Sequence, residues 1–521
     1  MSNGSDLAQE LDVAQLMPAQ YAAYRPLVAD GLRFFLEQIP PHRLAGIMAD
    51  QLEMPPSASL AERVVGLMRH CPSLHKLGQV VARDRRLAPD LRQRLQQLES
   101  LAPTTPAADV LAVLRREVGQ AATLAVGTHA LAEASVAVVV PFAWREPGSS
   151  TPTAGVFKVL KPGVEERLQE ELAIWPALGG FLEERCAHYG LPALEYRDTL
   201  DRVRKLLLNE IRLDLEQAHL AAAARTYADS PAVLIPRLLP FCTSRVTAME
   251  RVHGGKVTDA DLSADRRRRL AETMVEALVA RPFWSDAQAA TFHADPHAGN
   301  LFLSRDGRLA ILDWSLVARL SKAQREEVVQ LVLGALSLDD ARVCRALAAL
   351  GGRPAQSAAL RPAVADSLRQ VRRGTFPGFE WLLGLLDRLA GSGAMGFPQE
   401  LVLFRKALLS LSGVVADVSP GCSSDRVLIN VGAERFLREL PGRALTPADS
   451  RAFATHLSIA DLFGLWASYP ATTARFWIGT WQDALGTLRR PAAGLAGPPP
   501  ASGSTLHWPR RGTALGSQSV R

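Results

Sequence analysis

The stretch that decides the fold is His293-Ala-Asp-Pro-His-Ala-Gly-Asn300, which is followed, after residues 301–312, by Asp313. Asp295 and Asn300 lie close enough in one loop for both side chains to reach the same point. A carboxylate can accept a hydroxyl proton, and an amide oxygen is a suitable ligand for Mg²⁺. Residues 301–312 predict a hairpin of two short apolar strands around an Asp-Gly turn, which would return Asp313 to the loop. This order is typical of the metal and nucleotide side of a phosphoryl-transfer site.

The composition is that of an ordinary globular protein. The 521 residues carry a formal net charge of +6, mostly from arginine. So mild a charge does not indicate nucleic acid as a partner, but it suits a weak attraction to nucleotides or to an anionic membrane surface. The first residues show no signal-peptide pattern, and no long uncharged apolar run predicts a transmembrane span. The five cysteines lack metal-ligand spacing, so we expect a reduced, cytoplasmic protein, at most peripheral to the inner face of the membrane.

The chain changes character along its length. The helical and strand periodicities predict four regions: a helical extension at 1–125, a mixed region at 126–255, a mainly helical region with the catalytic loop at 256–490, and a disordered tail at 491–521. Within the mixed region we expect a hairpin at 136–160, helices at 164–227 and two further strands at 234–240 and 245–252. The sequence therefore predicts an α+β, bilobal fold with a small β-containing N-lobe and a helical C-lobe.

A strand lysine could complete the site. Lys158 lies inside the strand expected at 155–160, where a lysine can point inward and hold nucleotide phosphates if a carboxylate fixes it. Glu216 is the carboxylate that we expect to fix Lys158, and Glu210 and Asp214 are the alternatives. Lys161, at the end of the same strand, is expected to be an edge lysine in solvent.

Several segments resemble the motifs of the UbiB/AarF family of atypical kinases, the ADCK group in eukaryotes. Lys76-Leu-Gly-Gln79 is similar to the KxGQ motif, and His293–Asn300 resembles the HxDPHxGN catalytic loop. Phe157-Lys-Val-Leu-Lys-Pro-Gly and Met249-Glu-Arg-Val-His-Gly-Gly are similar to the strand lysine and the hinge of that family. The resemblance runs from about residue 70 to about residue 325 in the family's order, and KxGQ together with HxDPHxGN is a highly specific combination.

The resemblance implies a protein-kinase-like fold and a role for each motif residue. Lys158 would contact phosphates and Glu216 would orient it, while Asp295 would take the position of the catalytic-loop aspartate. Asn300 and Asp313 would hold Mg²⁺.

The resemblance also implies where ATP or ADP binds. The nucleotide site would be formed by the Ala-rich loop, the hinge and the helical extension, through Ala132, Ala134, Ser135, Glu250, Val252, Lys76 and Gln79. The extension would fold over the site, so that the acceptor is small or lipidic. The family is linked to ubiquinone and other isoprenoid-lipid metabolism.

The sequence departs from the family at three places. Glu133, Ala137 and Val138 replace the Ala, Gly and Gln of the Ala-rich loop. An acidic side chain near phosphates weakens nucleotide binding unless it faces away, and loss of the glycine limits close approach of the backbone. Arg212 lies between Glu210 and Glu216, which match two spaced glutamates of the family, at a position where the family usually has Asp. Asp313-Trp-Ser replaces Asp-Phe-Gly. An Asp-Trp pair is also seen in the aminoglycoside and choline kinase branch.

The motifs predict a Mg²⁺- and ATP-dependent atypical kinase or ATPase, and the resemblance implies that it acts in, or regulates, ubiquinone or lipid metabolism. The departures leave open a pseudokinase that binds nucleotide and acts through partners, and a small-molecule phosphotransferase of the aminoglycoside type. An aromatic stretch contains Trp466, Tyr469, Phe476, Trp477 and Trp481. We expect this stretch to pack in the core or between lobes, and contact with a membrane surface is the alternative.

Overall fold

The computed structural model describes residues 4–81, 89–97, 105–119, 124–192, 195–351, 357–391, 395–474 and 478. The tail expected to be disordered at 491–521 lies outside these residues.

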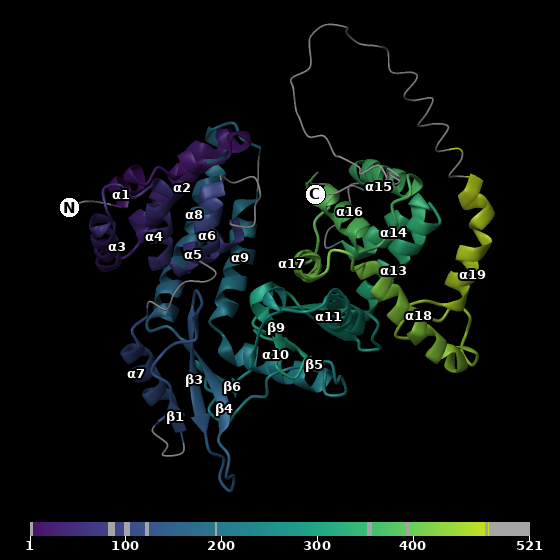
Figure 1. Ribbon diagram of the computed structural model, residues 1–521. Helices are drawn as coiled ribbons and strands as arrows, with labels where there is room; N and C mark the ends of the chain where they lie inside the picture. The colour runs from purple at the N-terminus through teal and green to yellow at the C-terminus, as the bar shows by residue number, and fades with distance from the viewer. Residues whose placement is uncertain are drawn as a thin grey trace, which may run out of the picture.

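The chain begins with a group of helices, drawn purple to blue in Figure 1: α1 Gly4–Glu10, α2 Arg25–Gln38, α3 Pro41–Glu53, α4 Leu60–His70, α5 Pro72–Val81, α6 Pro89–Gln97 and α7 Ala107–Val118, with 3₁₀ turns at Val13–Leu16 and Ala19–Tyr24. Helix α4 begins with a capping box, in which the Ser59 hydroxyl and the Glu62 carboxylate each accept a hydrogen bond from the other residue's backbone N–H. Leu36 and Ile47 are buried in one core with Trp175 of α8 (Val164–His188). The helical extension is therefore packed against the following lobe.

The N-lobe is built on an antiparallel sheet in the order β1-β3-β4-β6, with β2 paired to β3. Its strands are β1 Leu124–Val126, β2 Ala132–Glu133, β3 Ala137–Trp144, β4 Thr153–Leu160 and β6 Val246–Glu250. The hairpin expected at 136–160 is confirmed as β3 and β4. Phe157 and Val159 of β4 lie in the core beneath α7. Because neighbouring residues of a strand point to opposite faces, Lys158 points to the other side of the sheet.

Two expectations for this lobe need correction. The helical region at 164–227 is divided into α8, α9 (Tyr196–Glu210) and α10 (Leu213–Thr226), with a break at residues 211–212. The strand expected at 234–240 shrinks to β5, Val233–Leu234. Pro236 and Pro240 supply no backbone N–H, which removes two ladder donors from the segment.

The C-lobe carries two small sheets. The first has the order β5-β10-β9-β7 and contains β7 Gly254–Lys256, β9 Leu301–Ser304 and β10 Leu309–Ile311. The second pairs β8 (Ala289–His293) with β11 (Val317–Ser321). The hairpin expected at 301–312 is thus confirmed as β9 and β10. A Cβ at position 254 would collide with the carbonyl oxygen of Leu303, so the chain leaving the N-lobe needs a glycine there.

Helices make up the rest of the C-lobe. They are α11 Ala264–Val275, which continues through the π segment Glu276–Ala280 into α12 Arg281–Phe283, then α13 Lys322–Leu336, α14 Asp340–Leu350, α15 Ser357–Arg372, α16 Phe379–Gly391, α17 Gln399–Val418, α18 Ser424–Arg443 and α19 Ile459–Ala467; short 3₁₀ turns lie at Val257–Asp259 and Ala298–Asn300. One large core joins the sheets to these helices and includes Phe292, Trp314 and Phe404. Figure 1 shows the N-lobe sheet and the helical C-lobe as separate bodies side by side.

The α+β, two-lobed fold expected from the sequence is confirmed. The domain boundaries at 125, 255 and 490 stay predictions. Within the described residues, no helix combines the length and the apolar character needed to cross a bilayer.

Candidate active site

Lys158 brings the two lobes together. Its Nζ atom donates to both carboxylate oxygens of Glu216 at 2.8 Å, and it lies 3.2 Å from Oδ2 of Asp313. Glu216 lies in the first turn of α10 and is almost fully buried. Asp313 lies two residues after the end of β10 and keeps 35% of its side-chain surface exposed. The strand amine and the loop carboxylate therefore meet at one place, as the sequence predicted.

The two alternative carboxylates pair elsewhere. Glu210 accepts a hydrogen bond from Lys76 at 2.9 Å, and Asp214 binds the Arg212 guanidinium at 2.7 and 2.8 Å. Glu210 ends α9, before the break at residues 211–212, whereas Asp214 shares the first turn of α10 with Glu216. Arg212, one of the departures from the family pattern, is thus an exposed residue that is neutralised within its own turn.

One ammonium group serves two carboxylates here. Burial disfavours the charged Lys158, but attraction to Asp313 and Glu216 outweighs burial and raises its pKa. Burial also opposes ionisation of Asp313, yet Lys158 and the N–H of Ser315 hold the pKa of Asp313 well below its usual range. For Glu216, burial prevails over Lys158 and raises the pKa to about 7, with repulsion from Asp313 acting in the same direction. Asp313 therefore keeps its charge, and Glu216 takes up a proton first.

His293 ties the catalytic loop to the hairpin. Its Nε2 donates to the carbonyl oxygen of Leu312 at 2.9 Å, and its Nδ1 accepts from the backbone N–H of Asp295 at 3.2 Å. This pairing fixes the tautomer with the proton on Nε2, and burial lowers the pKa of His293, so the ring is neutral. The ring also packs edge-on against Trp314, with centroids 5.0 Å apart. One imidazole thus sets the position of Asp295 relative to the residue before Asp313.

Asn300 and Asp313 fit a magnesium ion. Asn300 Nδ2 donates to the backbone carbonyl of Asp295 at 3.1 Å, so the amide oxygen is the atom that Asn300 can offer to a metal. Asp313 has a φ of 53°, in the left-handed region that Asp adopts more readily than most residues. Among the described residues no group of three or more His, Cys, Asp or Glu side chains forms a cation site. One carboxylate, one amide and nucleotide phosphates are the donor set that Mg²⁺ commonly uses.

The extension reaches the site through Lys76. Burial disfavours the charge of this lysine, but Glu210, Asp295 and Asp313 together raise its pKa. Lys76 therefore lies in the electric field of Asp295 and Asp313. Gln79 is on the same helix, α5, and its side chain lies outside the described part of the chain.

A buried carboxylate holds α5 in place. Glu171 of α8 accepts a hydrogen bond from the backbone N–H of Ser73 at 2.9 Å, in the first turn of α5. The same carboxylate forms an ion pair with Arg43 of α3. Glu171 has no exposed surface, so its charge depends on these two partners.

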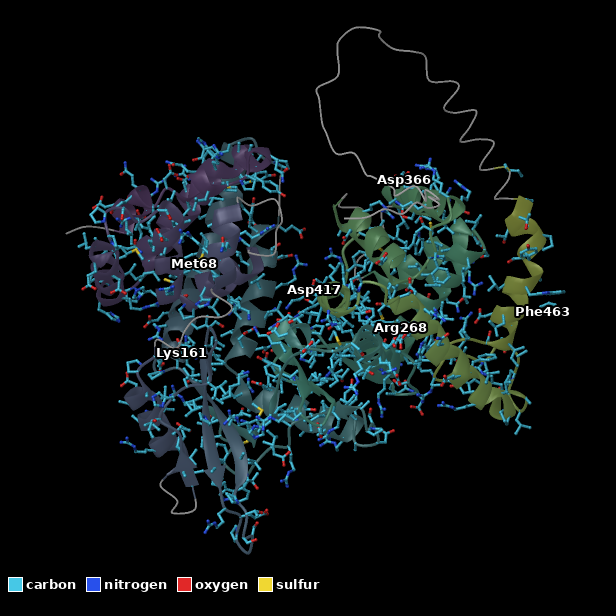
Figure 2. The ribbon with its side chains drawn as sticks, in the orientation of Figure 1. Met68, Lys161, Arg268, Asp366, Asp417 and Phe463 are labelled. Carbon is cyan, nitrogen blue, oxygen red and sulfur yellow. The ribbon has the colours of Figure 1, made fainter. Side chains whose placement is uncertain are left out.

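The Ala-rich loop differs from what the sequence suggested. Glu133 is buried, with Lys161 Nζ 2.7 Å from Oε1 and the backbone N–H of Thr105 donating to Oε2 at 3.0 Å. The expectation that Lys161 is an edge lysine in solvent is wrong, because the buried carboxylate needs a counter-ion and only 14% of the Lys161 side chain is exposed. Figure 2 shows Lys161 where the N-lobe sheet meets the helical extension. The acidic departure from the family pattern is thus neutralised within the protein.

The remaining nucleotide-site candidates line the same lobe. Ala132 lies in β2, and Ala134 and Ser135 form the turn into β3, where the backbone N–H of Ala134 donates to the Ala137 carbonyl at 2.8 Å. Glu250 ends β6 and accepts from Nε of Arg237 at 2.9 Å. Val252, two residues further on, is half-buried in the hinge. Their roles toward a nucleotide stay predictions.

One functional candidate was missed from the sequence. Lys406 of α17 places Nζ 3.1 Å from Oδ1 of Asp295. The only signal in the sequence is the basic pair Arg405-Lys406 inside a mostly apolar helix, and nothing in the pattern relates it to the catalytic loop.

The aromatic stretch near the C-terminus does not pack in the core where it is described. Trp466 and Tyr469 keep 74% and 72% of their surface exposed, so the expectation of core packing is wrong for both. Phe463 of α19 is 65% exposed as well, and Figure 2 shows it on the outer side of the molecule. Phe476, Trp477 and Trp481 lie outside the described residues.

Comparison with known proteins agrees with this geometry. The family model described as "ABC1 atypical kinase-like domain" matches residues 97–347, which include the N-lobe sheet, the catalytic loop and Asp313. The fold and the site define an atypical kinase-like protein with the bilobal, protein-kinase-like arrangement expected from the sequence.

Several relatives of this chain carry UbiB or aarF in their names. A probable protein kinase UbiB of Azotobacter vinelandii is 27% identical over 371 residues, covering 67% of this chain and 66% of the relative. A second one, of Pseudomonas fluorescens, is 26% identical and covers 71% of this chain and 70% of the relative. An uncharacterised aarF domain-containing protein kinase of Arabidopsis thaliana is 30% identical, with 47% and 46% covered. Together with the family model that matches residues 97–347, these relatives support a place in the UbiB/AarF family.

The match is partial in length. The chain spans about two thirds of the Azotobacter relative and less than half of the Arabidopsis relative. Among solved structures, Rv3197 of Mycobacterium tuberculosis, described as a complex with erythromycin, has a TM-score of 0.46 and 20% identity, covering 66% of this chain and 86% of that chain.

Proposed function

We propose that this protein is a Mg²⁺- and ATP-dependent phosphotransferase or ATPase that acts in, or regulates, ubiquinone or related lipid metabolism. The observation that carries the proposal is the 3.2 Å separation between Lys158 Nζ and Asp313 Oδ2, because it brings a phosphate-binding amine to a metal-binding carboxylate. The UbiB names of the relatives support the pathway.

Each side chain has a separate task in this proposal. Lys158, oriented by Glu216, contacts the α- and β-phosphates, while Asn300 and Asp313 hold the metal ion. When bound, Mg²⁺ neutralises charge on the β- and γ-phosphates. Asp295 orients the acceptor hydroxyl, or a water molecule, for attack on the γ-phosphorus. Most of the rate enhancement then comes from positioning and electrostatics.

The extension favours a small or lipidic acceptor. Lys76 on α5 is close enough to Asp295 and Asp313 to respond to their charge. A helix fixed beside the catalytic carboxylates limits the access of a folded protein substrate. The same extension argues against an aminoglycoside-type phosphotransferase, since that branch lacks the motif around Lys76.

Exposed aromatic side chains near the C-terminus are consistent with a lipidic acceptor. The exposed aromatic side chains Phe463, Trp466 and Tyr469 follow one another on and just after α19. Aromatic side chains of this kind enter the interfacial region of a bilayer. We propose that the protein is cytoplasmic and binds peripherally to the inner face of the membrane.

A nucleotide-sensing pseudokinase is the second candidate, and the replacement of Asp-Phe-Gly by Asp313-Trp-Ser favours it. MgATP hydrolysis by the wild type, Asp295→Asn and Asp313→Asn separates the two. Loss of hydrolysis in both variants is expected for the enzyme. Saturable nucleotide binding without hydrolysis, with lipid present, would leave the pseudokinase, and absence of binding would remove both candidates.

The pathway needs its own test. Quinones and lipids are profiled in a deletion strain that is complemented with the wild type or with Asp313→Asn. We expect the wild type alone to restore the quinone profile. A normal profile in the uncomplemented strain would remove the pathway assignment and leave the enzymatic proposal standing.

A further inference from the structure

The catalytic-loop aspartate is paired with a lysine from a distant helix. Lys406 Nζ lies 3.1 Å from Oδ1 of Asp295, and both side chains are partly exposed, at 34% for Lys406 and 18% for Asp295. Lys406 lies in α17, beyond residues 97–347 that match the family model. The pairing therefore depends on the C-terminal helices of this chain.

Packing fixes α17 to the strand that carries the loop. Phe404 is buried and meets Phe292 of β8 edge-on, with ring centroids 4.8 Å apart. Phe292 lies three residues before Asp295. On the neighbouring position of α17, Arg405 forms an ion pair with Asp387 of α16. The ammonium of Lys406 is thus held beside Asp295 by the same core that positions the catalytic loop.

The cations near the catalytic loop come from other elements of the fold. Residues 293–300 include no Lys or Arg. His297 accepts a hydrogen bond at Nδ1 from the backbone N–H of Gly299 at 3.0 Å. Lys158 is bound by Glu216 and Asp313, and Lys76 by Glu210. In the part of the chain that the structure describes, Lys406 forms an ion pair with Asp295 itself.

We propose that Lys406 is a catalytic residue whose ammonium group contacts the γ-phosphoryl group during transfer. The inference rests on the proposed function and adds a residue to its machinery. In the nucleotide-free protein the ammonium group is paired with Asp295, which keeps it at the point where the acceptor hydroxyl meets the γ-phosphorus.

The reaction requires only ATP and the acceptor as reactants. The acceptor oxygen forms a bond to the γ-phosphorus while the bond from that phosphorus to the β,γ-bridging oxygen breaks. The electron pair of the broken bond leaves with ADP, and the hydroxyl proton passes to the Asp295 carboxylate. Lys406 stays protonated throughout. Its charge offsets the negative charge of the phosphoryl oxygens as they approach the Asp295 carboxylate.

A purely structural role does not account well for the Lys406–Asp295 ion pair. A partly exposed ion pair between single side chains contributes little to folding stability. Because the transfer proceeds through a loose transition state, the acceptor proton leaves late and Asp295 needs little basicity. The neighbouring cation is therefore compatible with the role of Asp295.

The test measures MgATP hydrolysis by phosphate release, MgATP affinity and the thermal midpoint. It compares the wild type with Lys406→Met, Lys406→Arg and the control Arg405→Met, which removes the adjacent cation of α17. Lys406→Met is expected to lower kcat about 100-fold, as loss of one transition-state donor does. Its MgATP affinity should stay within about threefold of the wild type, since the change acts on the transition state. Lys406→Arg should recover part of kcat, and Arg405→Met should keep it.

The inference alone would be overturned by a kcat for Lys406→Met within about threefold of the wild type, or by an equal loss in Arg405→Met. A wild type that binds MgATP but hydrolyses none overturns the proposed function and this inference with it. A fall in kcat that only follows a fall in the thermal midpoint would likewise assign Lys406 to the fold and overturn the inference.

Discussion

Lys158 in the N-lobe sheet and Asp313 after the C-lobe hairpin lie 3.2 Å apart, from Nζ to Oδ2, and Glu216 shares the same ammonium group at 2.8 Å. The trio carries two carboxylates and one cation. When both carboxylates are ionised, one negative charge is left over, so a divalent ion bound by Asp313 would be attracted there and would free Lys158 to contact phosphate. Metal binding at Asp313 would thus exchange one cation, Lys158, for another.

Asp313→Asn should separate metal-dependent from metal-independent nucleotide binding. We expect MgATP hydrolysis to fall at least about 100-fold, because the metal loses its charged ligand. Binding of ATP in EDTA should stay unchanged or tighten, because a negative charge has left the site. Titration of a fluorescent ATP analogue with and without Mg²⁺ checks this. Equal losses in both conditions would contradict the assigned role of Asp313.

The pH dependence of stability should report Glu216. Its pKa is raised from 4.5 to about 7, chiefly by burial, so between these values the folded protein binds a proton that the unfolded chain does not. Stability from this group is therefore fully present below about pH 4.5 and is lost as the pH rises through about 7. We expect the free energy of unfolding of the wild type, measured against Glu216→Gln in urea, to fall across this range. Parallel curves for the two proteins would refute the assignment.

Glu171 should contribute much more to the free energy of unfolding than its neighbour Glu170 does. Glu171→Ala leaves Arg43 and the Ser73 N–H without their buried acceptor, and we expect a cost of about 3–5 kcal/mol in the free energy of unfolding. Glu170 contacts the same Arg43 at 3.1 Å but is 38% exposed, so Glu170→Ala should cost under about 1 kcal/mol. Urea unfolding of both variants measures these two costs. Similar costs would show that the contacts of Glu171 with Arg43 and Ser73 do not stabilise the position of α5.

Glu133 and Lys161 should behave as one unit. Lys161→Met strands a buried carboxylate and should destabilise the protein by about 3 kcal/mol. Adding Glu133→Ala, which restores the family's residue, should recover part of that loss, with a coupling energy of about 1–3 kcal/mol. Nucleotide affinity of the Glu133→Ala single variant should change less than about threefold, because the charge was already compensated. A large gain in affinity would mean that Glu133 acts on the phosphates.

The aromatic face of α19 should bind lipid. Replacing Phe463 and Trp466 by Ser should weaken binding to phosphatidylglycerol-containing vesicles at least about tenfold, given roughly 1.5–3 kcal/mol for each large apolar side chain buried. Leu445 is 88% exposed but lies outside α19, and Leu445→Ser is the control that should bind normally. Flotation assays compare the three proteins. Unchanged flotation of the double variant would remove the membrane contact.

Local patterns in the sequence predicted the parts of the site that depend on local structure. The β9–β10 hairpin and the β3–β4 hairpin follow from strand periodicity and turn residues. Glu216, rather than Glu210 or Asp214, is the carboxylate that pairs with Lys158 in the structure, and its role toward a nucleotide stays a prediction. The prediction of a strand at 234–240 was wrong, because two prolines restrict strand pairing to β5 despite the apolar character of the segment.

The pairings that were missed depend on tertiary structure. The Lys161–Glu133 pair forms only because β2 folds back along β3 and buries the carboxylate. The Lys406–Asp295 pair requires α17 to pack on β8, across more than a hundred residues of chain. No local pattern specifies either contact, because each depends on which elements the core brings together.

The left-handed backbone at position 313 has an evolutionary consequence. Asparagine adopts this conformation as easily as aspartate does, and a single-base change in the codon converts one into the other. A lineage could therefore give up the metal ligand without refolding the loop. One substitution at position 313 would therefore separate a catalyst from a protein that binds nucleotide without turnover, and the reverse substitution would restore the metal ligand.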